Sequence, residues 1–179
     1  MVTRYVGLLK AVNLPGHNKV KMAALCAMAA DAGMMDPRSL LASGNLVFGS
    51  AETDASAVER QLEQHAKAKL GLDTAFLVRS ASDWARIIAG NPFHLEAERD
   101  PGHLLVLVLR DAPARAAAAA LSEWIPGREV VQVNGRVAYA VYPDGIGNSK
   151  LTTAVIERKL GTQCTGRNWN TVQKLGAML

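Results

Sequence analysis

Four polar stretches of the chain carry the side chains best suited to bind a ligand. Each lies beside a tight turn or the expected start of a helix, where backbone N–H groups favour an anion. Their ammonium, guanidinium, amide and hydroxyl groups all donate hydrogen bonds to phosphate or carboxylate. The candidate ligand-binding residues are Asn13, His17, Asn18, Lys19, Ser43, Asn45, Ser149, Lys150, Arg167, Asn168 and Asn170. These residue types predict an anion-binding site.

Two of the stretches lie in the first half of the chain. Residues 13–19 are rich in turn residues and join an expected strand to an expected helix. Lys19 adds positive charge there, and His17 is a candidate for acid–base chemistry or, when protonated, for anion binding. The alternative is a loop that only caps its helix. At 42–45, Ser43 lacks the Gly-x-Ser-x-Gly pattern of a nucleophile elbow, which favours a structural hairpin turn.

Two further stretches lie in the second half. Residues 144–150 contain two glycines followed by a serine and a lysine, which is similar to part of a phosphate-binding loop but lacks its full spacing. The alternative there is a glycine turn with a helix cap. Within 161–171, Arg167 has the planar fork that pairs with a carboxylate or phosphate. Trp169 instead fits the core face of the last helix, by its spacing to the apolar residues that follow.

Metal and redox chemistry receive little support from the sequence. The four histidines are scattered, without a paired spacing or a Cys-x-x-Cys motif, so we expect no metal and no cofactor. Cys26 and Cys164 are too few for a disulfide scaffold. No nucleophile, base and orienting group can be matched, so no catalytic residue is assigned. The chain shows no signal peptide and no apolar run near the ~20 residues of a membrane span, and we expect a cytoplasmic protein.

The elements that position these residues follow from hydrophobic periodicity and turn signals. Hydrophobic residues make up 49% of the 179 residues, which is typical of a folded core. The expected strands are 4–12, two within 39–48, 74–79, 104–109, 129–133 and 137–142, and the expected helices are 20–32, 54–70, 83–89, 112–125, 149–160 and 168–178. Asn134-Gly135, between the last two strands, is a strong hairpin signal. This order predicts an α+β fold with two ferredoxin-like βαββαβ-type subdomains related by duplication. An extra C-terminal helix takes the place of the last strand.

The polar stretch 96–102 is expected to be a loop and marks the best boundary. We predict an N-terminal subdomain over 1–80, a connecting helix and loop over 81–102, and a C-terminal subdomain over 103–179. Strands 5–9 and 104–109 do not alternate apolar and polar residues. Both faces of these strands should therefore be covered, by the other half, by the terminal helix or by a partner chain.

Five motifs together resemble a bacterial family catalogued as domain of unknown function 1697. They are Tyr5 to Met22, Ala42 to Phe48, Asn91-Pro-Phe93, Gly147-Asn-Ser-Lys-Leu151 and Arg167-Asn-Trp-Asn-Thr-Val-Gln-Lys-Leu175. The resemblance covers nearly the whole chain and implies a cytoplasmic α+β protein of two related subdomains. It brings no established activity, cofactor or catalytic residue. The segment 10–15 departs from the Arg-Gly-Ile-Asn-Val-Gly that is common in the family.

The charge distribution supports one functional hypothesis over its rivals. The formal net charge is +4, and residues 1–30 and 145–179 each carry +4, balanced by the acidic middle. We predict that the four polar stretches converge on a groove between the subdomains and bind a small phosphate- or carboxylate-bearing ligand. One alternative is a nucleic-acid-binding module that uses aromatic residues of an open sheet face. Another is a homodimer whose apolar sheet is covered by its partner. An enzyme using His17 or Ser43 ranks below these.

Overall fold

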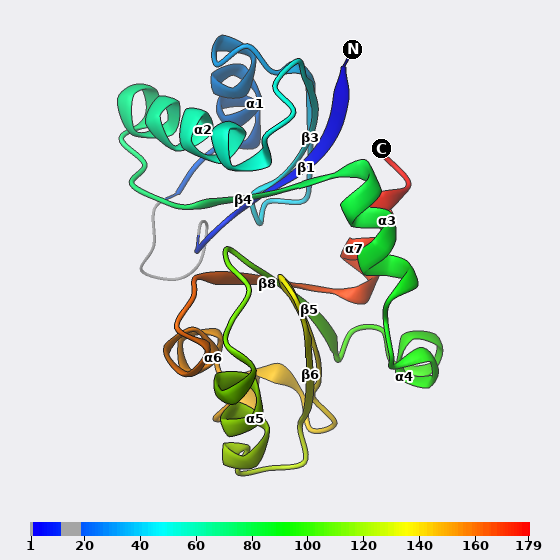
Figure 1. The fold of residues 1–179 in the computed structure, drawn as a ribbon. Coiled ribbons are helices and arrows are strands. Elements are labelled where there is room, and N and C mark those ends of the chain that lie inside the picture. Colours follow the sequence, from blue (N-terminus) through cyan, green and yellow to red (C-terminus); the bar gives the residue numbers. More distant parts are fainter. Residues whose placement is uncertain (1, 12–18) are drawn as a thin grey trace. The chain divides into compact units, whose positions relative to one another are not determined.

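The structure is a computed structural model that describes residues 2–11 and 19–179. The chain divides into two compact units, residues 1–86 with 175–179, and residues 87–174. Each unit contains one four-stranded antiparallel sheet (Figure 1). The predicted α+β fold of two duplicated ferredoxin-like subdomains is therefore confirmed.

The N-terminal unit has the element order βαββαβ. Its elements are β1 (Thr3–Leu9), α1 (Met22–Asp31), β2 (Met35–Leu40), β3 (Asn45–Ser50), α2 (Ala55–Leu70) and β4 (Phe76–Ser80). The strand order is β2-β3-β1-β4, and α1 and α2 cover one face of this sheet (Figure 1). The core between them includes Tyr5 and Phe48, whose rings stack with centroids 5.9 Å apart.

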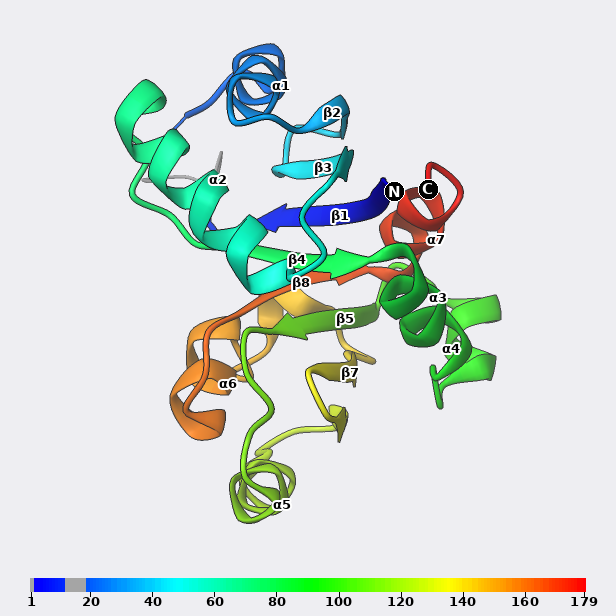
Figure 2. The ribbon, with the colours of Figure 1, turned by 45° about the horizontal axis from the view of Figure 1, so that its top comes forward.

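The C-terminal unit repeats this order. Helix α3 (Ala81–Ala89) crosses the boundary between the units, and the C-terminal unit continues with α4 (His94–Arg99), β5 (Leu104–Leu109), α5 (Arg115–Trp124), β6 (Val130–Asn134), β7 (Val137–Val141), the short 3₁₀ helix η1 (Ile146–Asn148), α6 (Thr153–Leu160) and β8 (Cys164–Asn168). Helix α7 (Trp169–Gly176) follows, and its last two residues group with the N-terminal unit. The strand order β6-β7-β5-β8 matches that of the first sheet, and α5 and α6 lie on one face of it (Figure 2).

The same local devices recur in both halves. Helices α2 and α6 each begin at a side-chain cap, Asp54 and Thr152, and each ends at a glycine in the left-handed region, with φ of 63° at Gly71 and 67° at Gly161. A glutamate side chain of each helix also accepts a hydrogen bond from the first residue of the last strand in the same repeat. Glu63 Oε1 accepts a hydrogen bond from Phe76 N (3.1 Å), and Glu157 Oε1 accepts one from Cys164 N (2.7 Å). The strand register repeats as well, because Leu9 faces Phe76 and Leu109 faces Cys164.

Three of the elements expected from the sequence differ in the structure. The last strand of the second repeat is present as β8, and the final helix follows it instead of replacing it. The sequence Cys-Thr-Gly-Arg-Asn shows no apolar alternation, but pairing with the buried strand β5 satisfies its backbone and makes it a strand. Part of the stretch expected as a loop forms α4, an exposed six-residue helix. Helix α6 starts at Thr153 and not at 149, because Thr152 Oγ1 caps it by accepting from Val155 N.

Strands β1 and β5 show the expected burial. All six residues of β5 and the last five of β1 are buried, so neither strand has a solvent-exposed face. The aromatic residues of the expected strands present no exposed stacking surface for nucleic acid, because all of their side chains are buried. These residues are Tyr5, Phe48, Phe76, Tyr139 and Tyr142.

Candidate functional site

A cavity of about 240 Å³ lies in the C-terminal unit, between the α5–β6 connection and the β7–α6 connection. The two connections are neighbours because β6 and β7 form a hairpin in which Val130 pairs with Val141. Residues just before 130 and just after 141 must therefore meet at the open end of the hairpin. The cavity is lined by Pro126, Gly127, Arg128, Glu129, Asp144, Gly145, Asn148, Ser149 and Lys150.

Two polar contacts hold the walls of this cavity together. Arg128 Nη1 lies 2.9 Å from Asp144 Oδ1, which joins the two connections by an ion pair. The Ser149 hydroxyl donates a short hydrogen bond to Glu129 Oε1 and accepts one from Leu151 N at 2.9 Å. The Arg128–Asp144 and Ser149–Glu129 contacts cross from one connection to the other, so they link the two walls of the cavity.

The second carboxylate oxygen of Glu129 is buried and makes no hydrogen bond to any described residue. It lies against Gly127, where an added Cβ would collide with it. Glycine at this position is what lets the carboxylate reach Ser149. A carboxylate accepts up to about four hydrogen bonds, so Glu129 keeps unused accepting capacity at the cavity wall.

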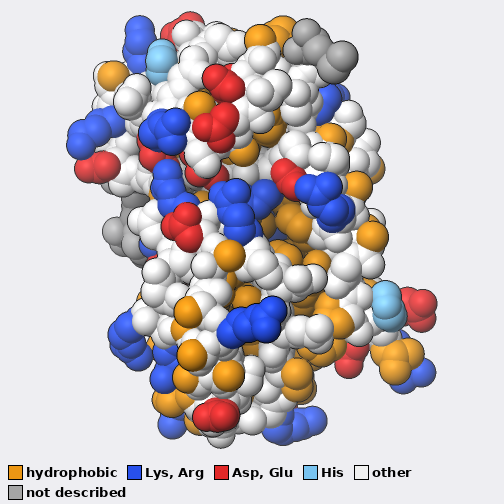
Figure 3. Space-filling model, in the orientation of Figure 1, with side chains coloured by type: hydrophobic (Ala, Val, Ile, Leu, Met, Phe, Trp, Pro, Cys, Tyr) orange, Lys and Arg blue, Asp and Glu red, His pale blue; other side chains and the backbone are white. Residues whose placement is uncertain are grey.

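The cavity carries both signs of charge. Arg128 and Lys150 are exposed, and the positive charge of Arg128 is largely met by Asp144. Lys150 has no ion-pair partner within residues 2–11 and 19–179, so its ammonium group is available to a ligand. Basic and acidic side chains are also interspersed on the face shown in Figure 3. Recognition of an anion here would therefore come from a local contact with Lys150 and not from a broad basic field.

The candidate residues of the first half divide into described and undescribed ones. Asn13, His17 and Asn18 lie outside the described residues, while Lys19 is exposed just before α1. Asn45 is fully buried, and its Nδ2 donates to Leu40 O (2.8 Å) and to Ser43 Oγ (2.9 Å). These bonds tie the turn between β2 and β3, which is the hairpin role favoured by the sequence.

The last candidate stretch lies on β8 and the start of α7, and none of its residues lines the cavity. Arg167 is buried and donates to Thr165 Oγ1 (2.9 Å) and to Gly166 O (2.8 Å). Its burial lowers the pKa of the guanidinium to about 10, so it remains charged at neutral pH. Asn168 Oδ1 caps α7 by accepting from Thr171 N (3.0 Å), and Asn170 is exposed.

The structure thus brings Ser149 and Lys150 together with residues that the sequence analysis did not select. Arg128 and Glu129 were missed because they belong to no local motif, and Asp144 lies in the stretch 144–150 but was not selected as a ligand-binding residue. The Asn134-Gly135 hairpin signal, followed outward along both strands, would have placed Arg128 and Glu129 beside residues 144–150. Lys19, Ser43 and Asn45 belong to the N-terminal unit and the other described candidates to the C-terminal unit. The predicted groove between the halves stays a prediction.

The model of a family described as "Protein of unknown function (DUF1697)" matches residues 2–139. The chain belongs to the DUF1697 family. A solved structure with a similar fold is that of a conserved bacterial protein from Streptococcus pneumoniae, with 23% sequence identity and a TM-score of 0.76. The similarity covers 99% of each chain, so the two-repeat fold extends over both proteins. No curated protein sequence matches this DUF1697 chain.

Three further observations concern membrane spans, metal sites and disulfides. Within the described part of the chain, no helix has both the length and the apolar character needed to cross a bilayer. In the same residues, no group of three or more histidine, cysteine or acidic side chains is placed to hold a metal ion. The thiols of Cys26 and Cys164 are both unbridged.

Proposed function

We propose that this DUF1697 protein binds a small phosphate- or carboxylate-bearing ligand in the cavity formed by residues 126–129 and 144–150. The observation that carries the proposal is Lys150, an exposed ammonium group at a walled cavity with no protein carboxylate paired to it in the described residues. Charge-assisted hydrogen bonds from such a group to phosphate or carboxylate are among the stronger polar contacts.

The size and chemistry of the cavity support a small ligand. Its volume of about 240 Å³ is below the roughly 300–1,000 Å³ typical of sites for drug-sized molecules. The wall is already braced by the Arg128–Asp144 and Glu129–Ser149 contacts, so little ordering is needed on binding. Ser149 is engaged by both Glu129 and Leu151 N, which supports a binding role for this loop over a nucleophilic one.

The charges of the wall give the proposal a test with two opposite outcomes. Lys150→Ala removes the cation that would contact the anion, and we expect about tenfold weaker binding, equivalent to about 1.4 kcal/mol. Glu129→Gln removes a negative charge from the same wall, and we expect tighter binding of an anion. Inorganic phosphate and citrate are the probes, titrated by calorimetry at low ionic strength.

Matched control variants separate the cavity from general charge effects. Lys69→Ala removes an exposed lysine of α2, and Glu123→Gln removes an exposed carboxylate of α5. Neither should change the affinity. No heat and no thermal stabilisation with either probe, or equal loss in Lys150→Ala and Lys69→Ala, would overturn the proposal. A ligand at ~100 times its Kd should stabilise the fold by about 2.7 kcal/mol, so binding would not escape detection.

A further inference from the structure

Strand β6 is an unprotected edge of the second sheet. It pairs with β7 through five consecutive residues, Val130 to Asn134, without a register shift. Its other side has no neighbouring strand among the described residues. The side chains of β6 are exposed at alternate positions. Val130 is 51% exposed, and Gln132 and Asn134 are also exposed. A strand without a bulge and with an open row of N–H and C=O groups is a template for pairing with another strand.

The equivalent edge in the first repeat is protected. Strand β2 holds the same place in its sheet as β6 does, but it contains Pro37 between Asp36 and Arg38. Its register shifts between Met35 and Arg38, and Asp36 has a φ of 46°. Proline, charge and a bulge are the devices by which proteins prevent edge pairing. Strand β6, with the sequence Val-Val-Gln-Val-Asn, has none of them.

We propose that β6 pairs antiparallel with β6 of a second copy of this chain, about a two-fold axis at Gln132. The strand is nearly self-complementary about that residue. Val131 would face the partner's Val133, and Gln132 would face the partner's Gln132. Pairing centred on a residue keeps the helices of both copies on the same side of the joined sheet, because directly opposed residues share a face.

The Val131–Val133 pairs of the proposed dimer lie on the face of the sheet that packs against the helices. Val131 and Val133 face the core formed with α5 and α6, where Val131 is 8% exposed and Val133 is partly buried. Joining the two edges would extend this apolar layer from one copy into the next and cover Val133 further. One strand pair buries less than the roughly 1,600 Å² of a standard interface, so the dimer should dissociate on dilution.

Charge at the axis tests the pairing directly. We expect wild-type protein to shift from monomer to dimer with rising concentration in sedimentation velocity. Gln132→Lys and Gln132→Glu each place two like charges face to face, and each should be a monomer. Mixed in equal amounts, the two variants should form a dimer again. Gln64→Lys, which adds the same charge to an exposed position of α2, is the matched control and should behave as wild type.

Three results would overturn the proposal. The first is a wild-type protein that stays monomeric at the highest attainable concentration. The second is a dimer that persists unchanged in Gln132→Lys, since the interface would then lie elsewhere. The third is failure of the mixed variants to associate while both remain folded by circular dichroism, since the axis would then not pass through Gln132. None of these readouts depends on a ligand in the cavity.

Discussion

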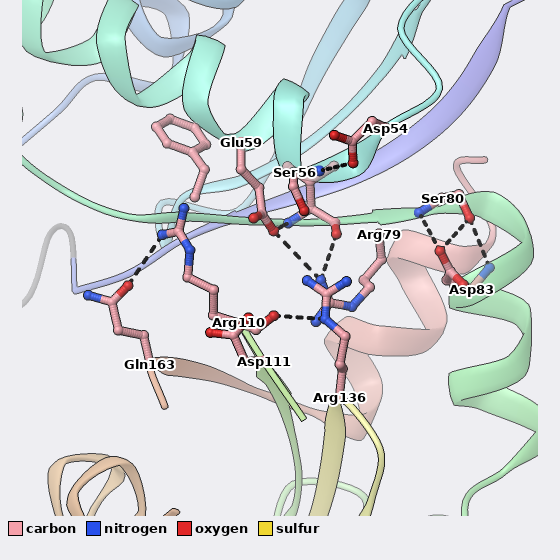
Figure 4. A network of polar contacts seen from close by, with 12 residues as sticks. Asp54, Ser56, Glu59, Arg79, Ser80, Asp83, Arg110, Asp111, Arg136 and Gln163 are labelled. Carbon is pink, nitrogen blue, oxygen red and sulfur yellow. Dashed lines mark hydrogen bonds and ion pairs between the residues drawn. The ribbon is translucent and has the colours of Figure 1, made fainter. Parts of the chain in front are cut away.

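Glu59 on α2 and Arg79 on β4 form an ion pair from which solvent is almost excluded. Glu59 Oε1 lies 3.7 Å from Arg79 Nη1, and the two side chains are 2% and 5% exposed (Figure 4). The same carboxylate oxygen accepts a hydrogen bond from Val78 N at 2.8 Å. Glu59 therefore joins helix to strand through both charge and backbone, and its loss would remove a carboxylate from beside a buried guanidinium and an acceptor from Val78 N.

Glu59→Ala is expected to destabilise the N-terminal unit strongly. Removing one partner of a buried ion pair typically costs about 3–5 kcal/mol, because the other charge stays desolvated. Urea denaturation should show this as a lower free energy of unfolding. Gln64→Ala, at an exposed position of the same helix, should stay within about 0.5 kcal/mol of wild type. Equal effects of the two substitutions would contradict the assigned role of Glu59.

Tyr139 should make stability fall at alkaline pH. Its hydroxyl donates to Ile87 O (2.7 Å), and burial raises its pKa to about 12. A raised pKa means that the folded state favours the protonated phenol. This contribution is complete below the ordinary value near 10 and is lost as the pH rises from about 10 to about 12.

Tyr139→Phe isolates this contribution. The variant loses one buried hydrogen bond, which we expect to cost about 0.5–1.5 kcal/mol at neutral pH. It should also lose part of the alkaline destabilisation, so the stabilities of wild type and variant should converge between pH 10 and 12. Denaturation curves across that range give the answer. Parallel pH profiles would show that Tyr139 does not titrate with unfolding.

Gly166 is required by the close approach of β8 to Leu105. A Cβ at Gly166 would lie 2.8 Å from Leu105 Cδ2 and 3.0 Å from its Cγ. We expect Gly166→Ala to destabilise by about 1–3 kcal/mol, as overpacking usually does. In a Leu105→Ala background the same change should cost much less, since the colliding atoms are gone. Gly102→Ala, where nothing lies within 4 Å, is the control.

Gly127→Ala should destabilise the wild-type protein but stabilise a Glu129→Ala variant. In wild type the new methyl group displaces the Glu129 carboxylate from Ser149, and loss of a hydrogen bond to a charged group costs about 1.5–3 kcal/mol. In a Glu129→Ala background nothing is displaced. There the substitution should stabilise by about 0.4–1 kcal/mol through the unfolded state. Destabilisation of the same size in both backgrounds would place the clash elsewhere.

The sequence predicts the regular elements well where apolar residues carry the signal. The expected strand at 104–109 matches β5, and Asn134-Gly135 forms the expected hairpin, with a φ of 57° at Gly135. Strand β8 was missed because Cys164–Asn168 has no alternating pattern. Its strand character comes from the neighbour β5, which no local window contains.

The candidate site shows the same limit. Ser149 and Lys150 stand out because glycines precede them, a feature visible in a few consecutive residues. Glu129 is distant in sequence and becomes part of the cavity only through the β6–β7 hairpin. Arg167 has the chemistry of an anion-binding residue, but its guanidinium turns back to its own strand. Residue type identifies what a side chain can do, whereas the fold decides where it points.

The final five residues, 175–179, group with residues 1–86 and not with the repeat that precedes them. One link is the hydrogen bond from Arg38 Nη2 to Met178 O, 3.2 Å long. During synthesis on the ribosome, the first repeat therefore emerges and folds long before its last contacts exist. The contacts between residues 175–179 and the first repeat can form only after the whole second repeat has been synthesised. The first repeat is therefore translated first but acquires its last contacts at the end of synthesis.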